Sequence, residues 1–283
     1  MPFKIAGTVI LYNPLAGYEN NILTYSNQVD CLFIVNNSDS PLPKEFDRFK
    51  NDEKIIFLGK NNNIGIGAAL NIALREASAR GFDLLLTMDQ DSSAEPGMIS
   101  ELSEYFNDNR VAIVSPQHHS PVSGKKPAVF PGCREVLTVM TSGNLVRIKI
   151  ITEIGGYAEN FFIDYVDNEI CLRLIAKGYK VLQCNHLFLR HNLGTEKVKT
   201  LLNRKFYPTN YSPERYYYQA RNRLYVYHSF KKLFPAFIKE DRRNFAKRII
   251  KMLLFEDNKT KKIKNIIRGY MDYFKSIQGK FTG

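Results

Sequence analysis

An apolar run that ends in two carboxylates is the first chemical signal in this sequence. Residues 84–93 are LLLTMDQDSS, so Asp89 and Asp91 follow a strand-like stretch directly. A turn needs only one acid to cap it, whereas two hard oxygen ligands suit Mg²⁺ or Mn²⁺ beside a phosphate. Ligands of open α/β sheets bind beyond the carboxyl ends of strands, which is where these acids stand. The alternative is a solvated turn in which Asp91 caps a helix that begins near Pro96.

A second group of acids surrounds a predicted helix start in FFIDYVDNEICLRL, residues 161–174. The helix dipole favours acids at this position, which is one explanation for Asp164, Asp167 and Glu169. Three acids exceed what a cap needs, and two phenylalanines stand beside them. A carboxylate against apolar walls is a reasonable general base, so the cluster is a candidate catalytic site.

Two further motifs carry less information. HNLG, residues 191–194, places His191 after a strand-like segment, where it is either structural or a ligand of a metal or phosphate. NNNIGIGAALN, residues 61–71, suggests a dinucleotide-binding loop, but Leu70 stands where the third glycine belongs, and the segment follows the third strand. With no P-loop and no nucleophile elbow in the sequence, nicotinamide enzymes, P-loop NTPases and α/β-hydrolases are excluded.

The elements that must position these residues alternate between strands and helices. Apolar, strand-like runs occupy residues 5–11, 31–35, 55–58, 84–88 and 111–115. The clearest helical pattern between them is 65–80, and Gly81 follows it as a C-terminal stop. Strands that are apolar on both faces and alternate with helices predict a parallel sheet covered on both sides.

The rest of the chain changes character. We expect a loop at 117–135, a strand at 136–140, a helix from about Arg147, a helix at 167–177 and a strand at 179–184. After about residue 196 strands are expected to vanish, leaving helices at 213–233, 236–256 and 260–278. The pattern predicts an α/β domain over residues 1–195 and a helical region over residues 196–283.

Charge separates the same two regions. The net charge is +12, but residues 197–283 hold 22 Lys and Arg against 6 Asp and Glu, while residues 1–196 hold 18 against 22. A basic region predicts an anionic partner, which is a membrane surface, a nucleic acid or a phosphorylated substrate. A solvated helical face is the plainer explanation.

Cysteine spacing and the chain start bear on the compartment. The four cysteines form no CxxC pair, which favours reduced thiols of a cytosolic protein. The first residues resemble a strand more than a signal peptide, and no apolar run reaches the roughly 18–20 residues of a membrane span. We therefore expect a cytoplasmic protein, peripheral at the inner face of the cell membrane.

Several motifs in fixed order resemble GT-A-fold glycosyltransferases of family two, and within them the bacterial rhamnosyltransferases. They are TVILYNP (8–14), VNNSDS (35–40), NNNIGIGAALN (61–71), LLLTMDQDS (84–92), TSGNLV (141–146), FFIDYVDNEICLRLIAKGYKV (161–181) and HNLG (191–194), with a weaker echo in YYYQARNRLYV (216–226). The resemblance implies a GT-A fold, with a mostly parallel sheet flanked by helices and followed by a C-terminal helical extension.

The resemblance also implies roles for individual residues. Asp91, with Asp89 and His191, would hold Mg²⁺ or Mn²⁺ on the diphosphate of the donor, and Asp167 would be the catalytic base. The residues expected to bind nucleotide and substrate are Leu11, Tyr12, Asn36, Asn37, Asn63, Asp89, Gly143, Asn144, Asp164 and Glu169. Two positions depart from the family: Asn36 stands where relatives usually carry Asp, and Val166 stands where many have Glu.

The activity implied is inverting, metal-dependent transfer of L-rhamnose from dTDP-L-rhamnose to a lipid-linked cell-surface polysaccharide. The alternative within the family is a UDP-hexose donor. An alternative of another class is a nucleic-acid-binding protein, but the basic residues lie outside any known nucleic-acid motif, so we expect no nucleic acid. The basic helices are expected to bind a membrane surface, to form a homodimer, or both.

Overall fold

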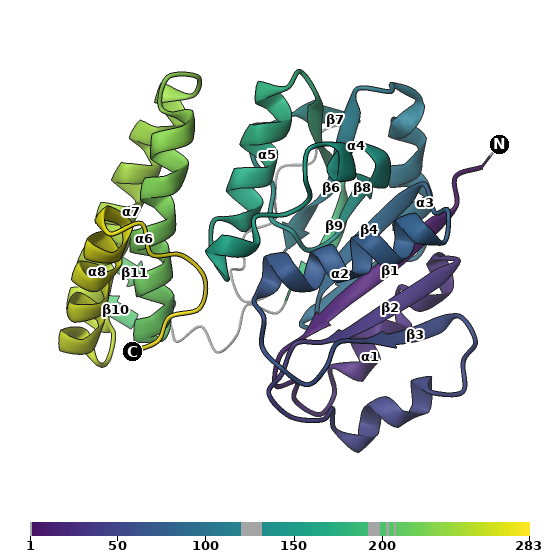
Figure 1. Cartoon of the computed structure of the whole chain (residues 1–283), viewed down its shortest axis with the longest axis horizontal. Coiled ribbons are helices and arrows are strands. Elements are labelled where there is room, and N and C mark those ends of the chain that lie inside the picture. The colour runs from purple at the N-terminus through teal and green to yellow at the C-terminus, as the bar shows by residue number, and fades with distance from the viewer. Residues whose placement is uncertain (1, 120–131, 192–198, 202–203, 207) are drawn as a thin grey trace. The chain divides into compact units, whose positions relative to one another are not determined.

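The chain folds into two compact units (Figure 1). The structure is a computed structural model that describes all residues except 1, 120–131, 192–198, 202–203 and 207. The sheet unit comprises residues 1–159 and 166–192, and the helical unit comprises residues 160–165 and 193–283. Residues 160–165 therefore group with the helical unit, although the residues on either side of them belong to the sheet unit.

The sheet unit is built on a mixed β-sheet. Its strands are β1 (Ile5–Leu11), β2 (Cys31–Asn36), β3 (Ile55–Leu58), β4 (Leu84–Asp89), β5 (Ser92–Ala94), β6 (Val111–His119), β7 (Cys133–Glu135), β8 (Asn144–Arg147) and β9 (Lys180–His191). Their order is β3-β2-β1-β4-β8-β6-β9-β5, and β7 pairs with β9. The first four strands are parallel, as predicted, but β8 is antiparallel to both its neighbours, so the sheet is less parallel than expected.

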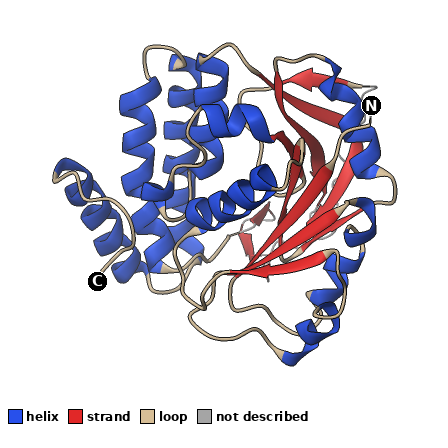
Figure 2. Cartoon of the chain, turned by 45° about the vertical axis from the view of Figure 1, so that its right-hand side comes forward, coloured by secondary structure: helices blue, strands red, loops and turns tan. Residues whose placement is uncertain are grey.

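Helices cover both faces of this sheet (Figure 2). They are α1 (Glu19–Leu23), α2 (Ile66–Ala79), α3 (Met98–Ser103), α4 (Ile148–Glu153) and α5 (Val166–Ala176), with 3₁₀ turns at Ser26–Gln28, Lys44–Phe49, Glu104–Asn107 and Glu159–Phe161. Alternate strand residues such as Val9 and Leu86 share one core with Ile22 of α1 and Leu102 of α3. Helix α2 packs against β1, β2 and β4 from the other side. The strands are therefore buried on both faces, as their apolar runs predict.

Between β6 and β8 the predictions fail. Residues 117–119 extend β6 instead of starting a loop, and Cys133–Glu135 form the short strand β7. The strand predicted at 136–140 is wrong, because these residues have no regular structure. Its apolar pattern reflects partial burial, with Val139 in the core. The remainder of the predicted loop, 120–131, lies outside the described residues.

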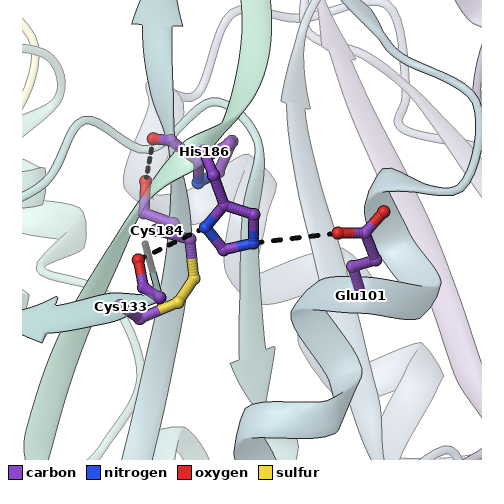
Figure 3. The surroundings of a disulfide bond; sticks show 7 residues. Glu101, Cys133, Cys184 and His186 are labelled. Atoms are coloured by element: carbon purple, nitrogen blue, oxygen red, sulfur yellow. Dashed lines mark hydrogen bonds and ion pairs between the residues drawn. A yellow bond between two sulfur atoms is a disulfide. The ribbon is translucent and has the colours of Figure 1, made fainter. Parts of the chain in front are cut away.

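The expectation of four reduced cysteines is also contradicted (Figure 3). Strand β7 pairs with β9 so that Cys133 faces Cys184, and the two form a disulfide. Beside it, His186 places Nδ1 3.3 Å from the carbonyl oxygen of Gly132 and Nε2 3.7 Å from Glu101 Oε2. Cys31 and Cys171 are buried free thiols, as expected. Spacing along the chain could not reveal the bonded pair, because strand pairing brings the two cysteines together.

The helical unit contains α6 (Pro213–Phe230), α7 (Pro235–Phe255), α8 (Lys259–Phe274) and a hairpin of β10 (Lys199–Leu201) and β11 (Arg204–Phe206). The hairpin contradicts the prediction that strands end near residue 196. Ser212 begins α6, since its side chain accepts a hydrogen bond from the Arg215 N–H. Pro235 stands in the first turn of α7, where its missing N–H costs nothing.

Polar side chains form much of the interior of the helical unit. Arg221 and Asn222 are fully buried on α6, and α8 crosses α6 so closely that a Cβ at Gly269 would lie 2.5 Å from the Tyr217 carbonyl oxygen. Tyr216 and Tyr217 are buried too, so part of the tyrosine-rich stretch belongs to the core of the helical unit. Within the described residues, no helix is both long enough and apolar enough to cross a membrane.

Candidate active site

A network of hydrogen bonds fixes the acidic turn after β4. The Asp89 N–H donates to Ser142 Oγ at 3.0 Å, and Ser142 Oγ in turn donates to Ser92 Oγ at 2.8 Å. On the other side, the Gln90 amide both accepts from the Tyr12 N–H at 2.9 Å and donates to the Tyr12 carbonyl at 3.2 Å. The turn is therefore tied to the end of β1 and to the segment before β8, which gives its carboxylates a defined place.

The donor atoms at this turn fit a hard divalent cation. Asp89 and Asp91 are partly exposed, and carboxylate oxygens are the ligands that Mg²⁺ and Mn²⁺ prefer. Burial raises the pKa of Tyr25 and of Tyr18. The negative charge of Asp89 raises the pKa of Tyr25 further, and that of Asp91 raises the pKa of Tyr18 further.

His191 is brought to the same turn by strand pairing. Antiparallel pairing of β5 and β9 sets the backbone of His191 opposite Ser92, one residue after Asp91. The structure does not describe the side chain of His191 or the rest of HNLG, residues 192–194. Among the described side chains, no group of three or more potential metal ligands gathers. The turn thus offers a pair of carboxylates, and a bound diphosphate and water would complete the shell of a cation.

The residues expected to cradle the nucleoside lie at the ends of β1 and β2. Leu11 is buried, Tyr12 is half-exposed, and the Asn37 N–H donates to the Leu11 carbonyl at 2.8 Å. The Asn36 amide donates to the Ser40 carbonyl at 2.9 Å and to Asn61 Oδ1 at 2.7 Å. Asn36 therefore shapes the loops around it with its side chain, which is a structural task that an Asp at this position could not perform as a donor.

Asn37 and Asn63 order the segment before α2. Asn37 Oδ1 accepts from the Ile64 N–H at 2.9 Å, and Asn63 Oδ1 accepts from the Gly65 N–H at 3.1 Å. The Asn63 N–H donates to Asp39 Oδ1 at 2.8 Å. The asparagines of this motif thus hold the loops at the carboxyl edge of β2 and β3 in place.

The segment TSGN, residues 141–144, leads into β8 and is held against β4 and the acidic turn. Gly143 has φ +80°, and a Cβ there would lie 2.9 Å from Pro116 Cγ, so both conformation and space require glycine. Its N–H donates to the Thr87 carbonyl at 2.7 Å. Asn144 is buried, and within the described residues its Oδ1 has no hydrogen-bond partner.

Asp167 lines a cavity of about 360 Å³ in the sheet unit. The other lining residues come from β6, from the segment before β8, from the start of α5 and from β9; they are Gln117, His118, Thr138, Val139, Met140, Asn168 and Gln183. Asp167 Oδ1 accepts from the Asn168 N–H at 2.8 Å. A carboxylate at a helix start that opens into a polar cavity can accept a proton from a bound hydroxyl.

The other two acids of the cluster have structural partners. Glu169 pairs with Arg173, whose Nε lies 2.8 Å from Glu169 Oε1 and whose guanidinium also donates to the Gly156 carbonyl at 2.6 Å. Asp164 belongs to the helical unit, where Arg215 Nη2 lies 2.7 Å from its Oδ1. The structure thus brings Asp167 to the cavity, while Glu169 and Asp164 hold arginines.

Asp164 also lies in an unusual stretch of backbone. Phe162, Asp164 and Tyr165 all have positive φ, at 66°, 62° and 67°, a conformation that costs about 1–3 kcal/mol for each non-glycine residue. The buried Asn222 amide on α6 stabilises the stretch by donating to three carbonyls, those of residues 161, 163 and 164. Asn222 lies in YYYQARNRLYV, the α6 segment with the weaker family resemblance. The role of this residue is therefore to hold the backbone of residues 161–164.

Sequence reasoning missed His118 and gave Ser142 no role of its own. His118 Nε2 lies 2.8 Å from the Ser142 carbonyl, so this nitrogen carries the proton. Ser142 therefore connects the acidic turn to the wall of the Asp167 cavity. The adjacent pair His118–His119 was a usable signal, but it lay in a stretch expected to be a loop.

Comparisons with known proteins bear on the fold and the activity. Residues 15–153 match the model of glycosyl transferase family 2. The chain is 27% identical over 242 residues to dTDP-rhamnosyl transferase RfbF of Shigella flexneri, which covers 78% of this chain and 79% of the relative.

Solved structures share the fold at low identity. One is TarS 1–349 of S. aureus, with a TM-score of 0.61 and 12% identity over 95% of this chain and 80% of TarS. Another is GalNAc-T7 with UDP, GalNAc and Mn²⁺, with a TM-score of 0.62 and 10% identity; the match covers 97% of this chain but only 56% of that one. The family match and the relative in Shigella flexneri identify the chain as a glycosyltransferase that resembles the rhamnosyltransferases of glycosyl transferase family 2.

Proposed function

We propose that this enzyme transfers L-rhamnose from dTDP-L-rhamnose to a hydroxyl of a lipid-linked saccharide, with inversion at the anomeric carbon. One observation carries the proposal: the hydrogen bonds of Ser142 connect the acidic turn at Asp89 to the cavity that Asp167 lines. A site for the diphosphate and a site for the acceptor then adjoin each other in the sheet unit. The identity of the sugar rests on the likeness to a dTDP-rhamnosyl transferase.

Asp167 is the proposed general base of the reaction. An acceptor hydroxyl in the cavity attacks the anomeric carbon of rhamnose, its proton passes to the Asp167 carboxylate, and the bond from that carbon to the diphosphate oxygen breaks. No enzyme nucleophile intervenes, so a single displacement inverts the anomeric centre. His118 and Gln117, which share the cavity wall, are proposed to orient the acceptor.

Asp91 and Asp89, with His191, are the proposed holders of Mg²⁺ or Mn²⁺. When bound, such a cation neutralises charge that develops on the departing diphosphate. Asp91 and Asp89 supply the hard oxygen ligands, and the Gln90 and Ser142 hydrogen bonds keep the turn from rearranging around them. The solved GalNAc-T7 structure contains Mn²⁺ and UDP, which supports a divalent cation in this fold.

A UDP-hexose donor is the second candidate. TarS of the same fold has been solved with UDP-GlcNAc. Its identity to this chain is only 11%, so the fold alone does not choose the donor. The dTDP-rhamnosyl transferase RfbF is 27% identical to this chain, and we therefore favour dTDP-L-rhamnose as the donor.

We further propose a division of labour between the units. The sheet unit would perform catalysis, and the basic helical unit would hold the enzyme at the inner face of the membrane, where lipid-linked acceptors reside. A homodimer formed through the helical unit is the alternative role for this region. Nucleic acid is not a proposed partner, since Tyr216, Tyr217 and Tyr218 are buried and cannot stack on bases.

The test is transfer measured across a panel of nucleotide sugars with Mn²⁺ or Mg²⁺. We expect dTDP-L-rhamnose to be consumed with release of dTDP, with UDP-glucose, UDP-galactose and UDP-GlcNAc at least about 100-fold slower in kcat/KM, because sugar hydroxyls that lack their partners leave polar groups unpaired. Preference for a UDP-hexose would replace the donor assignment, and activity undiminished by EDTA would contradict the metal assignment.

A further inference from the structure

The helical unit has a groove lined by apolar side chains from all three of its helices. The groove has a volume of about 650 Å³ and lies along α6, α7 and α8, within the range of roughly 300–1,000 Å³ that is typical of ligand pockets. Tyr227 of α6, Ile249 and Ile250 of α7, and Ile263 and Ile267 of α8 are among its lining residues. Apart from Arg223, Arg242 and the hydroxyls of Tyr227 and Tyr270, the side chains of this wall form no hydrogen bonds, so its apolar part suits an aliphatic chain.

The apolar surface continues beyond the groove. Ile250 and Ile267 are 56% and 53% exposed. One helical turn further along, Leu254 on α7 and Met271 on α8 are exposed as well, and Phe274 follows at 80%. Positions four apart lie on one face of a helix, so each helix carries an exposed apolar stripe that passes the groove. Stripes of this kind mark binding surfaces.

The charges on α7 and α8 are sorted by burial. Of the acids, Asp241 pairs with Arg223 at 2.7 Å and Asp272 pairs with Arg268 at 2.8 Å, and both are turned toward the interior. Glu240 is the one acid of α7 and α8 that is exposed, whereas nine Lys and Arg of these helices are exposed. The surface around the apolar stripes is therefore more basic than the composition of the helices suggests.

This charge distribution selects the occupant. A second copy of the chain would bring nine basic side chains against nine others, a like-charged contact that costs free energy. A nucleic acid would match the charge but not the exposed isoleucines and leucines, since its bases bind by stacking on aromatic rings. A bilayer with anionic head groups matches both the basic and the apolar side chains of the two helices.

We propose that α7 and α8 lie on an anionic lipid bilayer and that the groove along α6, α7 and α8 accommodates one aliphatic chain of a lipid. Arg242 lines the groove and stacks on Tyr227, its Cζ 5.1 Å from the ring centre, where it can meet a phosphate head group. The proposal deepens the membrane role in the proposed function, but it requires neither the rhamnose donor nor the catalytic assignments.

Vesicle co-sedimentation tests the surface. We expect wild-type protein to pellet with vesicles of phosphatidylcholine and phosphatidylglycerol at low salt, to release at high salt, and to bind pure phosphatidylcholine weakly. Ile250→Glu with Ile267→Glu should weaken binding at least about tenfold, because the stripes then carry charge. Leu233→Glu, at an exposed leucine outside α7 and α8, is the matched control and should bind like wild type.

A methylene series tests the groove separately. Octyl, decyl and dodecyl phosphate, each below its critical micelle concentration, should bind with affinity that rises up to about fourfold per methylene, while inorganic phosphate binds weakly. Ala246→Trp places a large ring at a groove-lining position without changing charge. It should remove the dependence on chain length while vesicle binding persists, and circular dichroism should show that the variant is folded.

Three results would overturn the inference. They are failure of wild-type protein to pellet with anionic vesicles at low salt, affinity for alkyl phosphates that is independent of chain length, and a wild-type dimer that Ile250→Glu converts to a monomer. The proposed function fails by a different measurement, because transfer to a short-chain, water-soluble acceptor should be unchanged in Ala246→Trp. Wild-type protein that transfers sugar but binds neither anionic vesicles nor alkyl phosphates would reject this inference and leave the proposed function standing.

Discussion

The acids of the two units differ in what faces them. In the helical unit, Asp164, Asp241, Glu256 and Asp272 each lie within 2.7–2.9 Å of a Lys or Arg nitrogen. In the sheet unit, Asp89 and Asp91 occupy a turn at the carboxyl edge of the sheet, and Asp167 lines a cavity. The contrast assigns the acids that pair with a Lys or Arg to the scaffold, and it makes the acids of the turn and of the cavity wall the candidates for chemistry.

The strongest test of this contrast concerns Asp91. Asp91→Ala should reduce transfer by about 10³-fold, since several kcal/mol of charge stabilisation on the diphosphate are lost, and should leave the melting temperature nearly unchanged. Transfer rates and thermal unfolding measured on the same preparation check both halves. Glu240→Ala, an exposed acid of the helical unit, is the control and should be fully active.

Substitution of Asp167 should affect catalysis, whereas substitution of Asp164 should affect stability. Asp167→Asn cannot accept the acceptor proton, so kcat should fall at least about 100-fold while donor binding is kept. Asp164→Asn loses its ion pair with Arg215 and should lower stability, with kcat per folded molecule little changed. Steady-state kinetics and urea unfolding of both variants check this. An active Asp167→Asn beside an inactive Asp164→Asn would reverse the assignment.

A buried pair in the helical unit should matter for stability alone. Lys262 Nζ lies 2.9 Å from Glu256 Oε2, and both side chains are almost fully buried. Lys262→Met leaves the Glu256 carboxylate without its cation and should cost about 3–5 kcal/mol of unfolding free energy, measured by urea denaturation. Lys264→Met, an exposed lysine on the same helix, should change it by less than about 0.5 kcal/mol.

The double variant sharpens this prediction. Lys262→Met with Glu256→Leu removes both charges and should recover most of the stability, because a well-packed apolar pair often equals a buried ion pair. If Lys262→Met is as stable as wild type, the comparison between the two units loses its energetic basis.

Alkaline pH should produce the smallest effect. Burial, followed by carboxylates such as Asp241 and Glu256, raises the pKa of Tyr216 and Tyr227 in the helical unit. A raised pKa in the folded state means that the stability these tyrosines contribute is complete below about pH 10, the unfolded value, and is lost as pH rises above it. Hydrogen exchange in α6 should accelerate together with tyrosinate absorbance. Ionisation of Tyr216 and Tyr227 near pH 10, with the amides of α6 still protected from exchange, would contradict this account.

Part of this molecule follows from sequence pattern alone. The apolar runs of β1 to β4, the helix ended by Gly81 and the helices predicted at 213–233 and 236–256 are local signals, and the structure confirms these elements to within a few residues. Strand β7 and the hairpin of β10 and β11 were missed because such short pieces carry no distinctive periodicity.

The candidate site was only partly predictable for a related reason. The cluster at 164, 167 and 169 looks uniform in sequence, and its members differ only through partners such as Arg215, which lies 51 residues from Asp164. The Cys133–Cys184 disulfide and the role of His118 likewise depend on which strands pair. Periodicity identifies elements, but it does not identify long-range partners.

The central claim is that the acidic turn of the sheet unit holds the donor diphosphate through a divalent cation. Calorimetric titration of dTDP in the presence of Mn²⁺ tests it most directly, with wild type, Asp91→Asn and Asp272→Asn compared at a temperature where all three are folded. We predict that Asp91→Asn weakens dTDP binding at least about tenfold and removes its dependence on Mn²⁺, while Asp272→Asn, a buried scaffold acid, binds like wild type. Equal, Mn²⁺-dependent binding of dTDP by Asp91→Asn and wild type would contradict the account.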